Sequence, residues 1–172
     1  TERVDIRDQF CQKLPGELFA SKPIYYPGMF SEILEMYQSG DFSSLGVAVD
    51  GLIFQSMNDY NQRIFKWKPV SSLTIDLKVT PDRKVYLLSK NQYELVQLDV
   101  NTNNCDRFAE TRELMTPSGL IYEFQWNVDA TTWTPIRIRL DKYKPNAKPT
   151  INSILKMIKT PISFEQIRAT VS

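Results

Sequence analysis

Histidine is absent from all 172 residues of the chain. Catalysis of the Ser-His-Asp or Cys-His kind within the chain is therefore excluded, and so is any metal site that needs a histidine ligand. Cysteine is scarce, because only Cys11 and Cys105 are present. Two cysteines so far apart form neither a disulfide framework nor a zinc motif, and they indicate a reducing compartment.

The chain also has little net charge and no long apolar run. The formal net charge is only +1, so total charge does not indicate a nucleic-acid-binding protein, although a local basic cluster still can. No apolar run approaches the roughly 18 residues of a membrane span, and the first residues do not form a signal peptide. We therefore expect an intracellular protein without a membrane anchor. The chain begins with Thr1 rather than methionine, which indicates a fragment or a processed product.

The first part of the chain is predicted to mix helix and strand. Apolar residues at helical spacing predict a helix over residues 29–39, which ends at Gly40. The mostly apolar segment 47–54 predicts a buried strand. After a polar loop over residues 56–62, residues 64–67 predict a second strand.

Beyond Pro69 the pattern is that of short strands separated by polar turns. Residues 73–79 alternate between apolar and polar side chains, which predicts a strand with one buried face. Further strands are predicted over residues 84–88, 93–98, 120–126 and 135–140. Such a series predicts a small antiparallel barrel. After Pro145 and Pro149, apolar residues at helical spacing predict a helix, which a second short one over residues 164–168 extends.

Two lysines lie two positions apart in the segment Phe65-Lys66-Trp67-Lys68-Pro69. On a strand they share one face, and Trp67 points to the other. Like charges side by side repel unless an anion lies between them, and a phosphate is the obvious candidate. An isolated pair of this kind is more often two solvated lysines on an edge strand. The neighbouring segments therefore decide how the pair is interpreted.

Three further segments give these lysines a context. Asp50 opens an otherwise apolar strand, where a carboxylate needs a solvent-facing end, a cation or a functional role. The segment Thr74-Ile75-Asp76-Leu77 follows the lysines. A basic segment then runs over residues 133–142, before a Pro-Asn pair at 145–146.

In this order, the segments resemble the covalent nucleotidyltransferase superfamily, which contains the mRNA capping guanylyltransferases and the polynucleotide ligases. Residues 50–54 (DGLIF) are similar to its fourth motif, residues 66–69 (KWKP) to its fifth, and residues 137–142 (RIRLDK) to its sixth. The tryptophan between the lysines, the TIDL segment and the W…RxRxDK…PN ending are most similar to the capping branch. Residues 18–23 resemble the segment that helps to hold the guanine there, so the resemblance covers about residues 18–146.

The sequence departs from the family pattern in one respect. The family's first motif is KxDG, whose lysine attacks the nucleotide, but the only Asp-Gly here is Asp50-Gly51, without a lysine two positions before it. The acidic third motif is missing too, and both are expected upstream of Thr1. The resemblance implies an α+β protein, in which the C-terminal part of a nucleotidyltransferase domain precedes an OB-fold β-barrel and a C-terminal helical segment. The expected limits are residues 1–69, 70–145 and 146–172.

The resemblance also implies a reaction in two steps. A lysine amine attacks GTP and forms lysyl-GMP, and the GMP then passes to the 5′-diphosphate end of RNA. Lys66 and Lys68 would neutralise the α-phosphate oxygens as charge develops on them. Asp50 would hold a divalent metal ion, Mg²⁺ or Mn²⁺, near the same phosphate.

The remaining expected site residues lie on both sides of this group. Arg139 and Lys142 would contact the β- and γ-phosphates from the OB-fold, which closes over the nucleotide. Asp76 and Asp141 would hold these cations in place or contact the triphosphate directly. Ser21 and Lys22 would hold the guanine. The expected catalytic residues are Lys66, Lys68, Arg139 and Lys142, and the expected GTP-binding set adds Ser21, Lys22, Asp50, Asp76 and Asp141.

Simpler explanations exist for each position. Asp50 is also explained as a solvated strand end, and Arg137 and Arg139 as a solvated strand face. Asp141 is also explained as an ordinary ion-pair partner, worth about 0–1 kcal/mol if exposed. Trp67 and Trp133 are more typical of core aromatics than of base-stacking platforms. Ser21 and Lys22 are explained equally well as an ordinary turn.

The main prediction is an mRNA guanylyltransferase that acts in the nucleus, or in the cytoplasm if it is viral. It would be active only together with an upstream part of the same polypeptide that carries KxDG, so the isolated chain is expected to be inactive. One alternative is a fragment of an ATP-dependent polynucleotide ligase. The other is a non-catalytic OB-type module, which would bind RNA without any dependence on GTP.

Overall fold

The computed structural model describes residues 27–40, 49–55, 64–103, 105, 108 and 118–171. The chain divides into two compact units, one formed by Thr1–Val49 with Ile162–Ser172 and the other by Asp50–Pro161. The predicted domain limits at residues 69/70 and 145/146 fall within the second unit, and they stay predictions.

In the first unit, helix α2 (Phe30–Ser39) follows a short 3₁₀ turn, η1 (Pro27–Met29). Ile33 and Leu34 are its buried residues, as expected for an amphipathic helix. Gly40 ends the helix with a left-handed backbone, at a φ of 71°, a conformation that glycine adopts without steric cost. The predicted helix over residues 29–39 is therefore confirmed.

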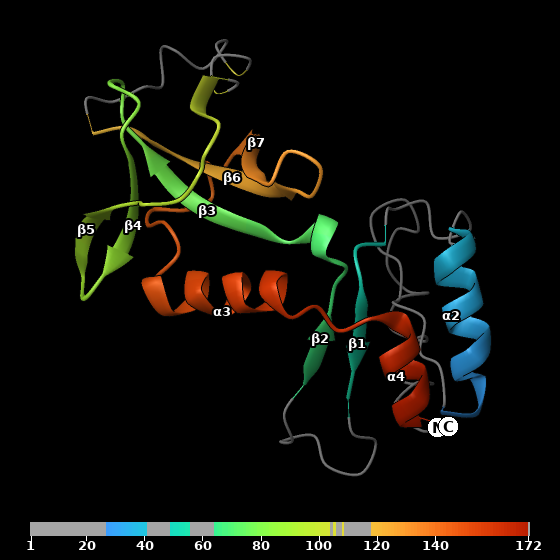
Figure 1. The fold of residues 1–172 in the computed structure, drawn as a ribbon. Coiled ribbons are helices and arrows are strands. Elements are labelled where there is room, and N and C mark those ends of the chain that lie inside the picture. Colours follow the sequence, from blue (N-terminus) through green and yellow to red (C-terminus); the bar gives the residue numbers. More distant parts are fainter. Residues whose placement is uncertain are drawn as a thin grey trace, which may run out of the picture. The chain divides into compact units, whose positions relative to one another are not determined.

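Helix α4 (Phe164–Val171) is the second described helix of this unit. Its Phe164 ring packs against the Tyr37 ring of α2, with 5.1 Å between the ring centroids. This contact brings together two segments of the same unit that lie far apart in the sequence (Figure 1). The predicted short helix after residue 164 is confirmed.

The second unit begins with a two-stranded antiparallel sheet of β1 (Leu52–Phe54) and β2 (Phe65–Trp67). Both strands lie within the predicted ones, although the described residues before Leu52 are not in a strand. The predicted loop over residues 56–62 lies outside the described residues. Trp67 is buried, in agreement with its interpretation as a core aromatic.

A 3₁₀ turn, η3 (Val70–Ser72), leads into a five-stranded sheet. The strand order is β5-β4-β3-β6-β7, and every neighbouring pair is antiparallel (Figure 1). The strands are β3 (Thr74–Val79), β4 (Val85–Ser89), β5 (Gln92–Leu95), β6 (Leu120–Asn127) and β7 (Thr132–Ile138). The hydrogen-bonded sheet thus changes between Trp67 and Thr74.

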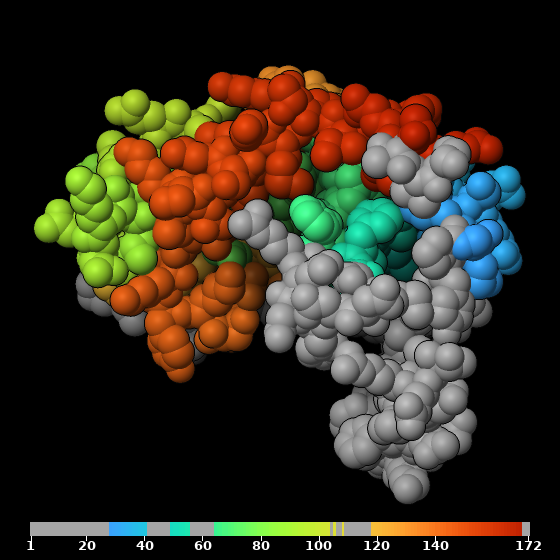
Figure 2. All heavy atoms as spheres, turned by 90° about the horizontal axis from the view of Figure 1, so that it is seen from below, coloured from blue at the N-terminus to red at the C-terminus, as the bar shows by residue number. Residues whose placement is uncertain are grey.

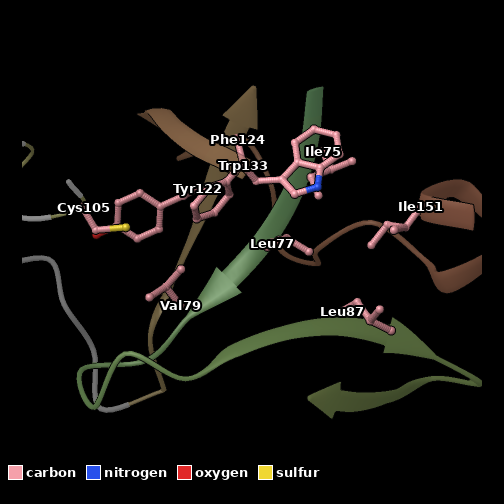
Figure 3. Close-up of a cluster of buried hydrophobic side chains, with 9 residues drawn as sticks. All are labelled: Ile75, Leu77, Val79, Leu87, Cys105, Tyr122, Phe124, Trp133 and Ile151. Carbon is pink, nitrogen blue, oxygen red and sulfur yellow. The ribbon is translucent and has the colours of Figure 1, made fainter. Parts of the chain in front are cut away.

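The sheet carries the main hydrophobic core on one face. The alternation predicted for residues 73–79 is confirmed, because the apolar members of β3 are almost fully buried. The core cluster drawn in Figure 3 is made by Ile75, Leu77, Val79, Leu87, Cys105, Tyr122, Phe124, Trp133 and Ile151. Each large apolar side chain buried in this way contributes about 1.5–3 kcal/mol, so the core holds β3, β6 and β7 rigidly together.

Helix α3 (Lys148–Lys159) packs on this core through Ile151 and confirms the predicted C-terminal helix. Pro149, in its first turn, is placed where a missing N–H costs least. The other side of α3 forms part of the surface beside β4 and β5 (Figure 2). None of the described helices has both the length and the apolar character that a membrane crossing requires.

The sheet remains open among the described residues, so the predicted antiparallel barrel is not confirmed there. Its β7 edge takes up the segment around Val100 through a parallel bridge to Trp133. Asn101 N donates to Trp133 O at 2.9 Å, and Trp133 N donates to Asp99 O at 3.0 Å. The fold is α+β, with mostly antiparallel strands and C-terminal helices.

Candidate functional site

Two carboxylates lie side by side on the polar face of the large sheet. Asp76 of β3 is directly opposite Glu123 of β6 in the strand register, and directly paired residues on neighbouring strands project to the same face. Their side chains are only 6% and 12% exposed. Two charges of the same sign at such a buried place repel strongly unless cations lie between them.

Arg139 supplies the central cation of this cluster. Its Nη1 donates to Asp76 Oδ1 at 3.1 Å and lies 3.5 Å from Glu123 Oε2. The other edge of the guanidinium donates to Asp141, with Nε 2.9 Å from Oδ1 and Nη2 2.8 Å from Oδ2. This is a two-point pairing of the kind that also suits phosphate.

Two more cations complete the cluster. Lys142 Nζ donates to the second oxygen of Asp76, Oδ2. Arg137 Nε donates to Glu123 Oε2 at 2.6 Å. Three carboxylates therefore face three cations, and the cluster is balanced in charge. We refer to Asp76, Glu123, Arg137, Arg139, Asp141 and Lys142 as the charge cluster.

A β-bulge decides that the two arginines lie on this face. Phe124 pairs with Pro135, but the next residue back, Glu123, pairs with Arg137 instead of Ile136. Because side chains alternate along a strand, a regular register would pair Arg137 with Tyr122, whose side chain belongs to the core. The extra residue, Ile136, turns Arg137 and Arg139 to the side of Asp76 and Glu123.

Asn146 fastens the segment after the charge cluster to the sheet. Its Oδ1 accepts a hydrogen bond from Asp76 N at 2.7 Å, and its own N donates to Asp76 O at 2.7 Å. Its carbonyl oxygen accepts from Leu88 N at 3.1 Å. The loop that carries Asp141 and Lys142 is thus anchored on β3 and β4 at its far end.

The pKa values follow from these contacts. The hydrogen bond from Arg139 lowers the pKa of Asp141 to about 2, and the pKa of Arg139 is raised chiefly by the same bond. Burial alone would raise the pKa of Glu123. Hydrogen bonds from Arg137 and Thr74, together with the charges of Arg137 and Arg139, outweigh burial and hold that pKa below its ordinary value. Glu123 and Asp141 are therefore both ionised near neutral pH.

A second, smaller group lies at the end of the two-stranded sheet. Lys68 Nζ donates to Asp50 Oδ2, and the two side chains are 34% and 69% exposed. The anion beside Lys68 is thus the carboxylate of Asp50. Lys66, which is paired with Ile53 in the strand register, is exposed and makes no ion pair among the described residues.

The structure therefore brings the sequence-predicted residues together in two sets. Asp76, Arg139, Asp141 and Lys142 form one set, and Asp50 and Lys68 form the other. Ser21 and Lys22 lie outside the described residues. Sequence reasoning missed Glu123 because the sequence around a single carboxylate in an apolar strand does not indicate which residues it will contact. The cross-strand register with Asp76 would have revealed it.

A divalent metal would find few protein ligands here. Within the part of the chain that the structure describes, no group of three aspartate, glutamate, cysteine or histidine side chains is arranged so that it could hold a metal ion. Mg²⁺ typically uses only one or two carboxylates and keeps its waters and the phosphates of its substrate. Asp50, exposed at a strand end, fits as a single protein ligand for a metal that arrives with a nucleotide.

The fold and the charge cluster define an α+β domain whose cations gather at the end of β7. Residues 52–168 match the family model described as mRNA capping enzyme, C-terminal domain, and the chain belongs to this family. The family resemblance seen in the sequence is thereby confirmed, and the chain corresponds to a C-terminal part of a capping enzyme.

Two curated relatives agree with this family. The chain is 30% identical over 125 residues to the mRNA-capping enzyme of Mus musculus, covering 69% of the chain and 20% of that protein. It is 29% identical over 159 residues to the mRNA-capping enzyme of Danio rerio, covering 84% of the chain and 24% of that protein. The chain thus spans between a fifth and a quarter of the length of these relatives.

Proposed function

We propose that this chain supplies the phosphate-binding part of a GTP:RNA guanylyltransferase. In the complete reaction a lysine amine attacks GTP, pyrophosphate leaves, and the lysyl-GMP passes its GMP to the 5′-diphosphate end of RNA. The 172 residues contain no KxDG, so another part of the same polypeptide provides the nucleophile. The protein acts inside the cell, in the nucleus, or in the cytoplasm for a virus that replicates there.

The observation that carries this proposal is the convergence of Arg139 and Lys142 on Asp76. The three residues come from two segments that are more than sixty positions apart. Phosphoryl transfer requires mainly positioning and neutralisation of charge, and a fixed guanidinium beside an ammonium group serves both needs. Asp141, which is exposed and holds the Nε–Nη2 edge of Arg139, occupies the geometry that a phosphate oxygen pair would take.

Lys66 and Lys68 are proposed to act on the α-phosphate. Lys68 would exchange its contact with the Asp50 carboxylate for a contact with phosphate, and Lys66 would add a second charge from β2, which ends one residue before Lys68. A Mg²⁺ or Mn²⁺ ion bound beside Asp50 would supply further positive charge at this phosphate. Ser21 and Lys22 are proposed to hold the guanine.

We further infer that the large sheet belongs to an OB-fold. An OB-fold is a five-stranded, partly open Greek-key barrel, and the observed order has five antiparallel strands in one sheet. The parallel bridge between Val100 and Trp133 supports this inference. It brings the chain that continues from β5, at one edge of the sheet, to β7, at the other edge.

Two other functions compete with this proposal. An ATP-dependent ligase shares the proposed chemistry, but the family match names capping enzymes. A non-catalytic RNA module needs no ordered charge cluster for polyphosphate. Thermal stability distinguishes the guanylyltransferase from the ligase. A capping enzyme containing this chain should be stabilised by GTP and not by ATP. RNA binding by this chain without any effect of GTP in the longer protein would favour the module.

The decisive experiment is the formation of labelled lysyl-GMP. The longer polypeptide with its KxDG segment is incubated with radiolabelled GTP and Mn²⁺, and the chain alone is treated in parallel. We expect an acid-labile, alkali-stable adduct on the longer polypeptide and none on the chain alone. An adduct on a lysine of the isolated chain would show that the nucleophile has been assigned wrongly, and no adduct on either would overturn the proposed function.

A further inference from the structure

Glu123 has no role in the reaction as proposed so far, yet within the charge cluster it contacts both arginines. Its Oε2 lies 2.6 Å from Arg137 Nε and 3.5 Å from Arg139 Nη1. One carboxylate oxygen is therefore shared by the two arginines. A carboxylate that bridges two guanidinium groups fixes their positions relative to each other.

The β-bulge makes this arrangement possible. With Ile136 as the extra residue, Glu123 is directly opposite Arg137. Without it, Arg137 and Arg139 would point to the core side of the sheet. Bulges of this kind commonly re-aim side chains next to active sites, and here the bulge and Glu123 act on the same two arginines.

Stability alone does not explain the buried carboxylates. Networks of buried ions can often be replaced by apolar residues without loss of stability, because desolvation offsets much of the attraction. On its own face of β6, the carboxylate of Glu123 is only 12% exposed and contacts the guanidinium groups of Arg137 and Arg139. The charge at position 123 therefore has a use in the arrangement of the arginines.

We propose that Glu123 is a positioning residue for phosphoryl transfer, which orients Arg139 directly and does so jointly with Asp76. This proposal rests on the proposed function of the charge cluster. Asp76 and Glu123 hold Nη1 from the buried side and keep the Nε–Nη2 edge turned towards the exposed Asp141. That edge is the one through which Arg139 would meet a phosphate.

A change of Glu123→Gln separates orientation from charge. The variant keeps the size of the side chain and one oxygen acceptor but removes the negative charge, so the charge cluster becomes more positive. A residue that served only as a counter-charge would, when neutralised, lower the KM for GTP and leave kcat unchanged. A positioning residue would instead lower kcat, because a neutral amide oxygen holds the two guanidinium groups more weakly than a carboxylate does, while the attraction for phosphate remains.

The kinetic test uses the longer polypeptide that carries KxDG. For Glu123→Gln we expect kcat for lysyl-GMP formation to fall about tenfold, which equals about 1.4 kcal/mol, with no rise in the KM for GTP. The matched control is Glu94→Gln, which removes an exposed carboxylate of the same sheet from its pair with Lys148 and should leave both constants unchanged. A wild-type kcat in Glu123→Gln would overturn the proposal.

A second measurement needs no reaction. In the ¹⁵N-labelled 172-residue chain, the Nε–H signals of Arg137 and Arg139, assigned by Arg→Lys variants, report how firmly each guanidinium is held. We expect both signals to exchange faster with water in Glu123→Gln and to be unchanged in Glu94→Gln. Unchanged signals in Glu123→Gln would contradict the positioning role even if kcat fell.

Two further variants keep the outcomes apart. If Glu123→Gln does not fold, Glu123→Asp retains the charge but withdraws the carboxylate by one methylene, so that it no longer reaches both arginines. The same loss of kcat is then expected, and a wild-type kcat would overturn the proposal. Arg139→Lys tests the proposed function separately, since wild-type adduct formation in that variant would refute the role of Arg139 whatever the arginine signals show.

Discussion

The charge cluster on the large sheet and the Asp50–Lys68 pair at the end of the two-stranded sheet contain the same kinds of charged groups in opposite settings. In the cluster, Arg139 is 14% exposed and is held by three carboxylates. In the pair, one ammonium meets one carboxylate, and Asp50 is 69% exposed. Exposed ion pairs of this kind contribute about 0–1 kcal/mol to stability.

This difference in burial shows that the fold fixes the geometry of the charge cluster but not that of the Asp50–Lys68 pair. A five-stranded sheet with a core beneath it fixes the cluster before any ligand arrives, so changes there should affect folding and function together. The pair, at the end of a short two-stranded ladder, keeps its freedom to exchange partners. Changes of its charged side chains should reduce activity while stability stays nearly the same.

The largest effect is expected for Arg139→Ala. It leaves Asp76 and Glu123 buried with one cation fewer, although Lys142 and Arg137 still pair with them. We expect the free energy of unfolding to fall by about 2–3 kcal/mol, somewhat less than for a buried pair that loses its only partner. Adduct formation by the longer polypeptide should fall by about 10²–10³-fold. Denaturant unfolding and lysyl-GMP labelling measure the two losses.

The control for this change is Lys148→Ala, which removes an exposed partner of Glu94. It should alter the unfolding free energy by less than about 1 kcal/mol and leave adduct formation intact. Equal destabilisation by the two changes would contradict the distinction between a buried cluster and a surface pair.

Lys66→Ala and Lys68→Ala should each reduce adduct formation by about 10² or more, the scale of one lost preorganised charge contact. Because Lys66 is exposed on β2 and Lys68 forms a partly exposed ion pair just beyond that strand, the unfolding free energy should change by less than about 1 kcal/mol. Arginine should restore activity poorly at either position, since its planar fork delivers charge in a different geometry.

Lys78 and Lys84 provide the comparison for these lysines. Lys78 lies over the Tyr93 ring, and Lys84 pairs with Asp82, so neither belongs to the proposed site. Their alanine variants should form the adduct at wild-type rates. If folded Lys66→Ala and Lys68→Ala proteins also do so, the two lysines are a solvated strand edge.

Gly51→Ala should disrupt the backbone that holds Asp50 and Lys68 together. A Cβ at this position would overlap the carbonyl oxygen of Trp67, and a backbone atom cannot rotate away. We expect the strand pair beside Asp50 and Lys68 to shift, with a loss of about 1–3 kcal/mol in unfolding free energy. Gly28→Ala, where a Cβ would have open space, is the control, and equal thermal midpoints for the two variants would refute the clash.

The smallest effect concerns acid stability. The hydrogen bond from Arg139 lowers the pKa of Asp141 from 3.8 to about 2. A carboxyl whose pKa is depressed by folding stabilises the folded state above its unfolded pKa, and this contribution is lost as pH falls through the folded pKa. Asp141→Asn should therefore lose less thermal stability than the wild type as pH falls from about 4 to about 2.

Asp82 sharpens this comparison, because the pKa of its carboxyl is also lowered to about 2, chiefly by Lys84, outside the charge cluster. Asp82→Asn should flatten the same part of the pH profile to a similar extent. If only Asp141→Asn flattens it, the acid stability depends on the cluster as a whole rather than on each local pair.

Much of the local structure could be predicted because it depends on neighbouring residues. The alternation over residues 73–79 gave the buried face of β3, and helical spacing before Gly40 gave α2. The predicted strand over residues 47–54 was too long, since the described part before Leu52 is not paired. Strand ends depend on hydrogen-bond partners, which a local pattern does not contain.

The sequence by itself determined which charged residues are available and which family the chain resembles, because both depend only on the residue types and on the order of the motifs. It did not determine which groups meet. Glu123 entered the charge cluster only through its register with Asp76, and the arginines reached that face only through the bulge at Ile136. Both are relations between strands far apart in the chain, which hydrogen bonding and packing establish only when the sheet forms.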